Sequence, residues 1–213
     1  MSVRELASLS DAELLEAWRG GHTDAGQELC ERHYKSVERF LVNKVGAEQA
    51  VDLAQQAFMA CVEARDRITT SFRAYLLTTA YYILCRHFRH RHHDANFDPD
   101  EECLRDHEPS PSSLVVRTQE QRLLLEALRA IPFKYQTLLE LHYWEELSTQ
   151  EIAGVLSIPS GTVRSRLQRA RDALEAQLAA LARSRALLES TLTGLDDWAA
   201  RCRGEALGGV PRS

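Results

Sequence analysis

The sequence predicts an all-α protein made of two small helical domains joined by an acidic flexible linker. Apolar residues recur at helical spacing along most of the 213-residue chain, and stretches with strand periodicity are nearly absent. The ten glycines and six prolines are few and fall mainly where the helical periodicity breaks. From residue 94 to residue 113 the periodicity stops, and carboxylates, proline and serine dominate, as in a flexible linker.

The linker accounts for the charge of the whole chain. The formal net charge is −5, but residues 94–113 hold seven carboxylates and one arginine, a net charge of −6. The rest of the chain is therefore nearly neutral and has concentrated basic patches, which matter more for nucleic-acid contact than the total charge. We expect a first domain at residues 1–93, the linker at 94–116, a second domain at 117–182 and a C-terminal extension at 183–213.

Cap residues and periodicity place the helices. In the first domain, Ser10 and Glu13 can cap a short helix that Gly20-Gly21 ends. Three further helices are expected from residue 23 or 24 to Gly46, at 49–64, with Phe58 and Val62 facing inward, and from 72 to about 93. In the second domain, helices at 117–130 and 134–144 are broken at Pro132 and lead into the segment 148–171.

The segment 148–171 has the pattern of a helix-turn-helix. Ser148 and Glu151 can form a capping box for the first helix. The periodicity stops around Pro159, a residue that is tolerated only in the first turn of a helix, and the second helix opens at Thr162.

The second helix of this segment has one apolar and one polar face. Val163, Leu167 and Ala170 share the apolar face, which leaves the polar face free to enter a DNA major groove. Arginine suits guanine edges and phosphates alike. An ordinary helical hairpin with a solvated basic face would show the same spacing. The candidate DNA-binding residues are Arg164, Ser165, Arg166, Gln168, Arg169 and Arg171.

The helix expected at 72–93 interleaves aromatic and basic residues. Flat rings can stack on unpaired bases, and arginines can hold the phosphates of a separated strand. Phe72 and Tyr75 would equally suit a hydrophobic core. The candidates for single-strand binding are Phe72, Arg73, Tyr75, Tyr82, Arg86 and Arg89.

Two sets of motifs resemble the sigma-70 family of bacterial RNA polymerase sigma factors, most closely its small extracytoplasmic-function (ECF) group. Residues 146–153 and 159–171 resemble region 4 of that family. Residues 31–34, 52–58 and 71–93 resemble region 2. The order of the motifs and the position of the linker also match.

The resemblance implies a sigma factor that directs core RNA polymerase to specific promoters and initiates transcription. Region 2 would bind the clamp helices of the largest polymerase subunit through Asp52, Gln55 and Gln56, and its aromatic and basic residues would hold the minus-10 strand. Region 4 would read the minus-35 duplex and contact the polymerase flap. Whether an anti-sigma factor binds this protein stays open.

The chain also departs from the family pattern. Gln56 stands where the family usually has glutamate, so one charge of the polymerase contact is missing. Tyr75 replaces a usual tryptophan, and Thr78, Tyr81 and Tyr82 stand where Arg, Arg and Asn are common. The minus-10 base preference is therefore open.

Nothing in the sequence predicts an enzyme, a cofactor or a metal site. We find no Gly-rich phosphate loop, no nucleophile motif and no carboxylate pair in an apolar setting. The histidines near Cys85 are crowded at one helix end without a second spaced cluster, so a basic patch is expected there rather than a metal site. They are His87, His90, His92 and His93.

The cysteines and the hydropathy favour a cytoplasmic protein. The five cysteines are scattered and lack a Cys-x-x-Cys pair, as expected in a reducing compartment. No apolar run reaches transmembrane length, and the first residues lack a signal-peptide core, so we expect no membrane insertion.

Two other functions remain open on the sequence alone. A stand-alone helix-turn-helix transcriptional regulator would carry a ligand or receiver module in place of the single-strand pattern. A helical adaptor that does not bind DNA would use both basic faces on acidic proteins. In the extension we expect a helix to about Cys202 that packs on a protein surface, because an apolar face runs through Leu187, Leu188, Leu192, Leu195 and Trp198.

Overall fold

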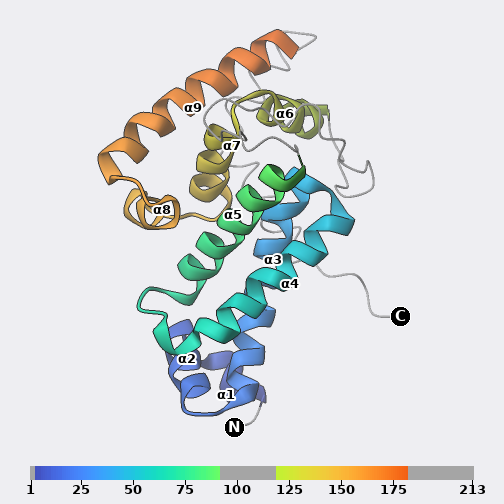
Figure 1. Ribbon diagram of the computed structural model, residues 1–213. Helices are drawn as coiled ribbons and strands as arrows, with labels where there is room; N and C mark the ends of the chain where they lie inside the picture. Colours follow the sequence, from blue (N-terminus) through green and yellow to red (C-terminus); the bar gives the residue numbers. More distant parts are fainter. Residues whose placement is uncertain (1–2, 92–118, 182–213) are drawn as a thin grey trace. The chain divides into compact units, whose positions relative to one another are not determined.

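The computed structural model describes residues 3–91 and 119–181, and these residues form helices with no β-strand among them (Figure 1). The all-α prediction is confirmed. The linker expected at 94–116 and the apolar face expected in the extension lie outside the described residues.

The helices fall into two compact units. The first unit contains α1 to α5, and the second contains α6, α7, η3, α9 and most of α8. The first comprises α1 Val3–Ser8, α2 Asp11–Arg19, α3 Thr23–Val45, α4 Ala47–Ala64, the short 3-10 turn η1 Arg65–Arg67 and α5 Phe72–Arg91. The second comprises α6 Gln119–Ala130, α7 Phe133–Leu139, the π-helical turn η3 Glu140–Trp144, α8 Thr149–Leu156 and α9 Ser160–Leu181.

The ends of α2 and α3 lie where the sequence places them. The Glu13 amide donates to the Ser10 hydroxyl at 3.4 Å, and the Ser10 amide donates to the Glu13 carboxylate at 2.8 Å, which is the expected capping box. Gly21 and Gly46 have φ angles of 96° and 84°, a region that side-chain-bearing residues avoid. These two glycines therefore end α2 and α3.

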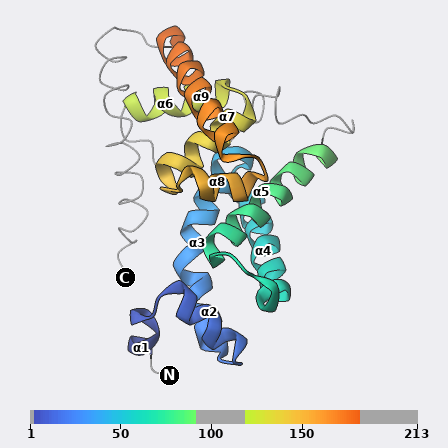
Figure 2. The ribbon, with the colours of Figure 1, turned by 90° about the vertical axis from the view of Figure 1, so that its left-hand side faces the viewer.

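In the first unit, α3, α4 and α5 pack against one another and α2 packs on α3 (Figures 1 and 2). Leu29, Leu53 and Leu76 are each at most 5% exposed and bring one side chain from each of the three helices into the core. Gly26 of α3 lies directly against Trp18 of α2. A Cβ at Gly26 would come within 2.5 Å of the indole, so this close approach requires glycine.

Phe72, at the start of α5, belongs to this core. Its side chain is 1% exposed, and its ring centroid lies 6.2 Å from that of Trp18 and 5.9 Å from that of His33. We expected Phe72 among the residues that stack on bases. The structure corrects this expectation, because a ring enclosed by α2 and α3 has no free face for a base.

The outer side of α4 is more apolar than the sequence suggested. Phe58 and Val62 were expected to face inward, but Phe58 is half-buried and Val62 is 40% exposed. Phe58 instead stacks on Tyr34 of α3 at a centroid distance of 6.0 Å. Because α4 packs against both α3 and α5, its small residues Ala54 and Ala57 fill the inward face.

The second unit is organised around α9, which packs against α6 and α7. The buried residues of α9 continue the predicted apolar face for two further turns: Val163, Leu167, Ala170, Leu174 and Leu178. The helix expected at 134–144 is in fact α7 followed by the wider π-helical turn η3. α9 begins at Ser160, and Pro159 precedes it and accepts the Val163 amide at 3.1 Å, so the proline caps the helix instead of lying in its first turn.

Candidate nucleic-acid interfaces

The helix-turn-helix of the second unit has the predicted cap. The Ser148 amide donates to the Glu151 carboxylate at 2.8 Å, and the Glu151 amide donates to the Ser148 hydroxyl at 3.3 Å. Ser157 then adopts a φ of 54°, which turns the chain between α8 and α9. The result is a short helix, a tight turn and a long helix, the geometry in which a second helix can enter a major groove.

The polar face of α9 is open to solvent. Arg164, Ser165, Gln168, Arg169 and Arg171 are exposed, whereas Arg166 is half-buried. The Ser165 hydroxyl donates to the Thr162 carbonyl at 3.0 Å, and the Gln168 amide donates to Asp172 at 3.0 Å. Arg164 and Arg169 bond to no residue of the described part of the chain. They are therefore the most available donors of this face.

Arg171 has a second task that the sequence did not indicate. Its Nε donates to the Tyr143 hydroxyl at 2.8 Å, and its guanidinium lies 5.6 Å from the centre of the Tyr143 ring. This pair links α9 to η3 and fixes the end of the polar face. Tyr143 thus contacts a candidate site residue, and only the fold brings it to Arg171.

The first unit contains a groove of about 1300 Å³ between α4 and α5. It is lined both by residues expected to bind polymerase and by residues expected to bind a single DNA strand. From α4 come Asp52, Gln55, Gln56, Met59, Ala60 and Glu63. From α5 come Tyr75, Thr78, Thr79, Tyr82, Ile83, Arg86, Arg89 and His90.

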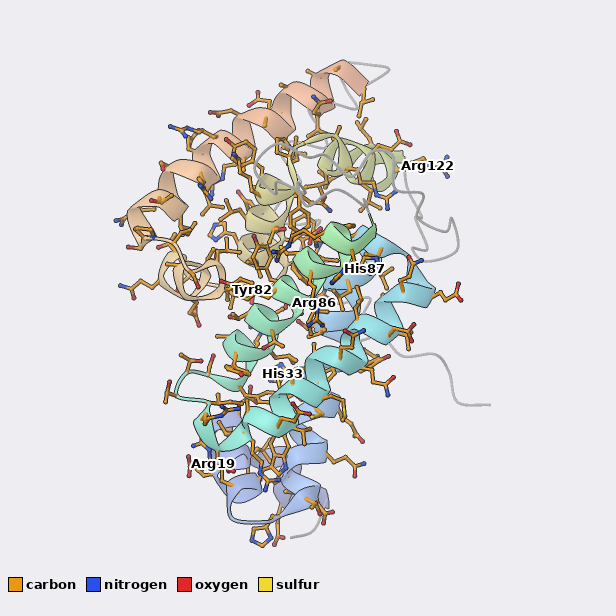
Figure 3. The ribbon with its side chains drawn as sticks, viewed as in Figure 1. Arg19, His33, Tyr82, Arg86, His87 and Arg122 are labelled. Atoms are coloured by element: carbon orange, nitrogen blue, oxygen red, sulfur yellow. The ribbon has the colours of Figure 1, made fainter. Side chains whose placement is uncertain are left out.

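The two walls of the groove differ in chemistry. The α5 wall is aromatic and basic, and Tyr82 is 46% exposed, with Arg86 one helical turn away (Figure 3). The α4 wall has carboxylates and amides. Across the groove, Arg86 Nη2 donates to Gln56 Oε1 at 3.1 Å. Phe72 and Arg73 lie outside the groove, so the predicted single-strand set is only partly brought together.

A second feature of the first unit, an exposed apolar stripe on α4, was not predicted from the sequence. Val51, Met59 and Val62 are 47%, 54% and 40% exposed on α4, and Met59 also lines the groove. Gln55 lies between them on the same side, because positions 51, 55, 59 and 62 recur at helical spacing. The helical spacing of these residues is visible in the sequence, but the same spacing would equally suit side chains that pack in a core.

Arg19 and His33 make contacts between helices of the first unit (Figure 3). Arg19 of α2 donates from Nε to the Arg65 carbonyl at 3.0 Å and from Nη2 to the Ile68 carbonyl. It thereby fixes the connection from α4 to α5. His33 of α3 lies 2.5 Å from the Asp11 carboxylate, measured from Nε2.

Burial and charge act in opposite senses at His33 and Asp11. Burial favours the neutral imidazole and outweighs the attraction of Asp11, so the pKa of His33 is lowered, and Arg73 and Arg32 lower it further. Burial also opposes ionisation of Asp11. His33 and Arg32 together more than offset that effect, so the pKa of Asp11 lies below its ordinary value.

Other chemistry is limited in the described residues. No group of three or more His, Cys, Asp or Glu side chains there could hold a metal ion. Burial raises the pKa of the Cys30 and Cys85 thiols, and that of Cys61 to about 12, which disfavours reactive thiolates. None of the helices within residues 3–91 and 119–181 is long and apolar enough to cross a membrane. His92 and His93 lie outside the described residues.

Comparison with known proteins finds sigma factors that are similar to this chain. Residues 121–174 match the family described as Sigma-70, region 4. The RNA polymerase sigma-H factor of Pseudomonas aeruginosa is 29% identical over 191 residues, covering 84% of this chain and 98% of the relative. The ECF RNA polymerase sigma factor SigW of Bacillus subtilis is 28% identical over 170 residues, covering 74% and 91%.

Solved structures show the same fold. CnrH, in a complex with the cytosolic domain of CnrY, aligns with a TM-score of 0.60 at 20% identity, over 81% of this chain and 99% of that one. The sigma factor RpoE of Bartonella quintana, in a complex with the anti-sigma factor NepR, aligns with a TM-score of 0.55 at 20% identity, over 72% and 96%.

Proposed function

This chain belongs to the sigma-70 family of RNA polymerase sigma factors, in the ECF group, and from that premise we propose that its two units divide promoter recognition between them. The protein directs core RNA polymerase to specific promoters and initiates transcription. Sigma factors are in general initiation factors rather than enzymes. We propose that this one acts in the cytoplasm and catalyses no reaction of its own.

The second unit would read the minus-35 duplex with α9. The observation that carries this proposal is the exposed polar face of α9, with Arg164 and Arg169 unbonded in the described part of the chain. Arg164, Ser165, Gln168 and Arg169 point away from the packed side and can reach base edges or phosphates. Arg166 and Arg171 would contact the DNA backbone rather than base edges, because Arg166 is half-buried and Arg171 is bonded to Tyr143.

The first unit would hold the melted minus-10 strand along the α5 wall of the groove. Tyr75 and Tyr82 supply rings, and Arg86 and Arg89 supply charge, on a surface that has room for a single strand. Arg73 lies outside the groove, and Phe72 supports the site only as a core residue.

Core polymerase would dock on the exposed side of α4, which includes part of the α4 wall of the groove. Asp52 and Gln55 are exposed there, and the neighbouring Val51, Met59 and Val62 form an apolar stripe whose burial would contribute to the binding free energy. Gln56 was expected in this contact, but its side chain is bonded to Arg86. We propose the clamp helices of the largest subunit as the partner of this surface and the polymerase flap as a partner of the second unit.

The boundaries 1–93, 94–116, 117–182 and 183–213 remain our proposal for the domains, the linker and the extension. We also propose that an anti-sigma factor regulates the protein, because the relatives CnrH and RpoE were solved in complexes, and the partner of RpoE is named as an anti-sigma factor.

Transcription reconstituted with core polymerase on fragments of host genomic DNA tests the function. The unaltered chain should start transcripts at a defined set of sites that core polymerase alone does not use. Val62→Glu should weaken core binding about tenfold or more, because it places a charge in the apolar stripe. Ala7→Glu adds the same charge at an exposed position of α1 and should bind core normally.

Two results would reject the proposal. Site-specific DNA binding without any effect on core polymerase would indicate the stand-alone regulator. Equal core binding by the Val62→Glu and Ala7→Glu variants would show that polymerase docks elsewhere on the chain.

A further inference from the structure

The contact between Gln56 and Arg86 joins the two walls of the α4–α5 groove. We propose that Gln56 is a positioning residue for Arg86, which it holds in place without neutralising its charge, so that Arg86 remains a full cation for a backbone phosphate of single-stranded DNA. The inference rests on the proposed binding of a single strand in this groove. It assigns to Gln56 a role other than the polymerase contact expected from the sequence.

The geometry favours a tether of this kind. Gln56 and Arg86 are thirty positions apart in the chain, yet Arg86 Nη2 donates to Gln56 Oε1 at 3.1 Å. Both side chains are exposed, so the bond restricts the guanidinium without removing it from water. Tyr82 precedes Arg86 by one helical turn and is 46% exposed (Figure 3). A base stacked on Tyr82 would therefore have its phosphate near Arg86.

The charges around the groove make the neutral partner significant. The α4 wall also contains Asp52 and Glu63, and the α5 wall contains Arg89. No ion pair among the described residues joins Arg86 to either carboxylate. The guanidinium instead bonds to an amide oxygen, which accepts a hydrogen bond but carries no net charge.

A carboxylate at position 56 would act differently. It would accept the same hydrogen bond but would pair its negative charge with Arg86, and a phosphate would then have to compete with it. Each phosphate contact on a single strand contributes about 0.7 to the slope of log affinity against log salt concentration. Whether Arg86 is available to a phosphate is therefore measurable through that slope.

The experiment measures binding of a fluorescent single-stranded DNA of mixed sequence, about 20 nucleotides long, to the full chain by anisotropy at KCl concentrations of about 50–200 mM, where counterion release dominates. Gln56→Glu should lower the slope by about 0.7 and weaken binding about fivefold near 0.1 M salt. Gln56→Ala places no carboxylate beside Arg86 and should keep the slope, with a smaller loss of affinity. Arg86→Gln should lower the slope as much as Gln56→Glu does.

The matched control is Gln49→Glu. It adds the same charge on the same helix, two turns from Gln56 and outside the groove, where salt screens it from a phosphate bound at Arg86. Its slope should stay close to that of the unaltered chain. Thermal unfolding of each variant confirms that the first unit is folded.

The possible failures can be told apart. If Arg86→Gln leaves the slope unchanged, or if the unaltered chain does not bind the DNA, the groove does not hold phosphate and the proposed minus-10 role of this groove fails. If Arg86→Gln lowers the slope but Gln56→Glu behaves like Gln49→Glu, the positioning role of Gln56 is wrong. The binding of a single strand in the groove is then still supported. Equal loss of slope in Gln56→Ala and Gln56→Glu would also overturn the inference, because charge would then not be the cause.

Discussion

The two candidate interfaces are built differently: the polar face of α9 lies on one helix, whereas the groove of the first unit takes its residues from α4 and α5. Residues on one helix share a face whenever the helix forms, because 3.6 residues per turn fixes their directions. Residues on two helices meet only when both helices pack in one alignment. A helical face can thus be found by spacing, and a groove cannot.

The buried side chains of the two helices show the same contrast. On α9 every buried residue is apolar, and Arg164, Arg169 and Arg171 are exposed. On α5 the aromatic residues divide, since Phe72 and Phe88 are 1% and 0% exposed and Tyr82 is 46% exposed. The identity of a ring does not tell whether it fills a core or meets a ligand. Its place among neighbouring helices decides this.

The largest effect should come from Phe72, which tests the division of aromatic roles on α5. Phe72→Ala should lower the free energy of unfolding of the first unit by about 3–5 kcal/mol, because it leaves a cavity beside Trp18 and His33. Urea unfolding followed by circular dichroism measures the change. Phe72→Leu should restore much of the stability and bind single-stranded DNA normally. A stable Phe72→Leu variant with no DNA binding would mean that the ring contacts a base.

A substitution on the polar face of α9 should change DNA binding rather than the stability of the fold. Arg169→Ala should lose about 1–3 kcal/mol at one minus-35 position and relax the base preference there. Its free energy of unfolding and its affinity for core polymerase should be unchanged, because the side chain is exposed and unbonded in the described part of the chain. Competition binding with a set of minus-35 variants measures the preference. An equal loss of affinity for every minus-35 sequence would show that Arg169 contacts only phosphate.

Replacing each of two helical glycines by alanine should change the free energy of unfolding in opposite directions. The comparison tests the difference between a tightly packed and an open helix surface. Gly26→Ala should destabilise the first unit by about 1–3 kcal/mol, because the new methyl group would overlap Trp18. Gly154→Ala should stabilise α8 by about 0.5–1 kcal/mol, because the added Cβ meets open space and alanine favours the helix. Thermal unfolding compares them, and a loss of stability in both would contradict the open surface around Gly154.

The smallest effect concerns pH and is confined to the first unit. The pKa of His33 is lowered in the fold, so the unfolded chain takes up a proton first as the pH falls below about 6.5. Stability should therefore decrease from pH 7.5 to pH 5.5, by at most about 1.4 kcal/mol per pH unit for one proton. Asp11, whose pKa is also lowered, should add a further loss below about pH 4.

His33→Gln is the control for this pH dependence, since it removes the titrating imidazole. The variant should show a smaller loss of stability than the unaltered chain between pH 7.5 and pH 5.5 in urea unfolding. The same loss in both proteins would assign the pH dependence to other groups.

Spacing and cap chemistry alone determined the helical class, most helix boundaries and the polar face of α9. Ser10 with Glu13 and Ser148 with Glu151 form the expected capping boxes, and Gly46 ends α3. These features depend on residues close in the chain, so their geometry follows from local sequence. The motifs at 52–58 and 159–171 also indicated the family.

The tertiary structure alone decided which residues from distant segments meet. It placed Phe72 in the core, exposed Val62, brought Tyr143 to Arg171 and set Gln56 against Arg86. Each of these outcomes depends on how helices pack, and helix packing is fixed by the shapes of many side chains at once. Amphipathic spacing gives the direction of each side chain around its own helix axis, but the neighbour that it meets is set by the alignment of the other helices.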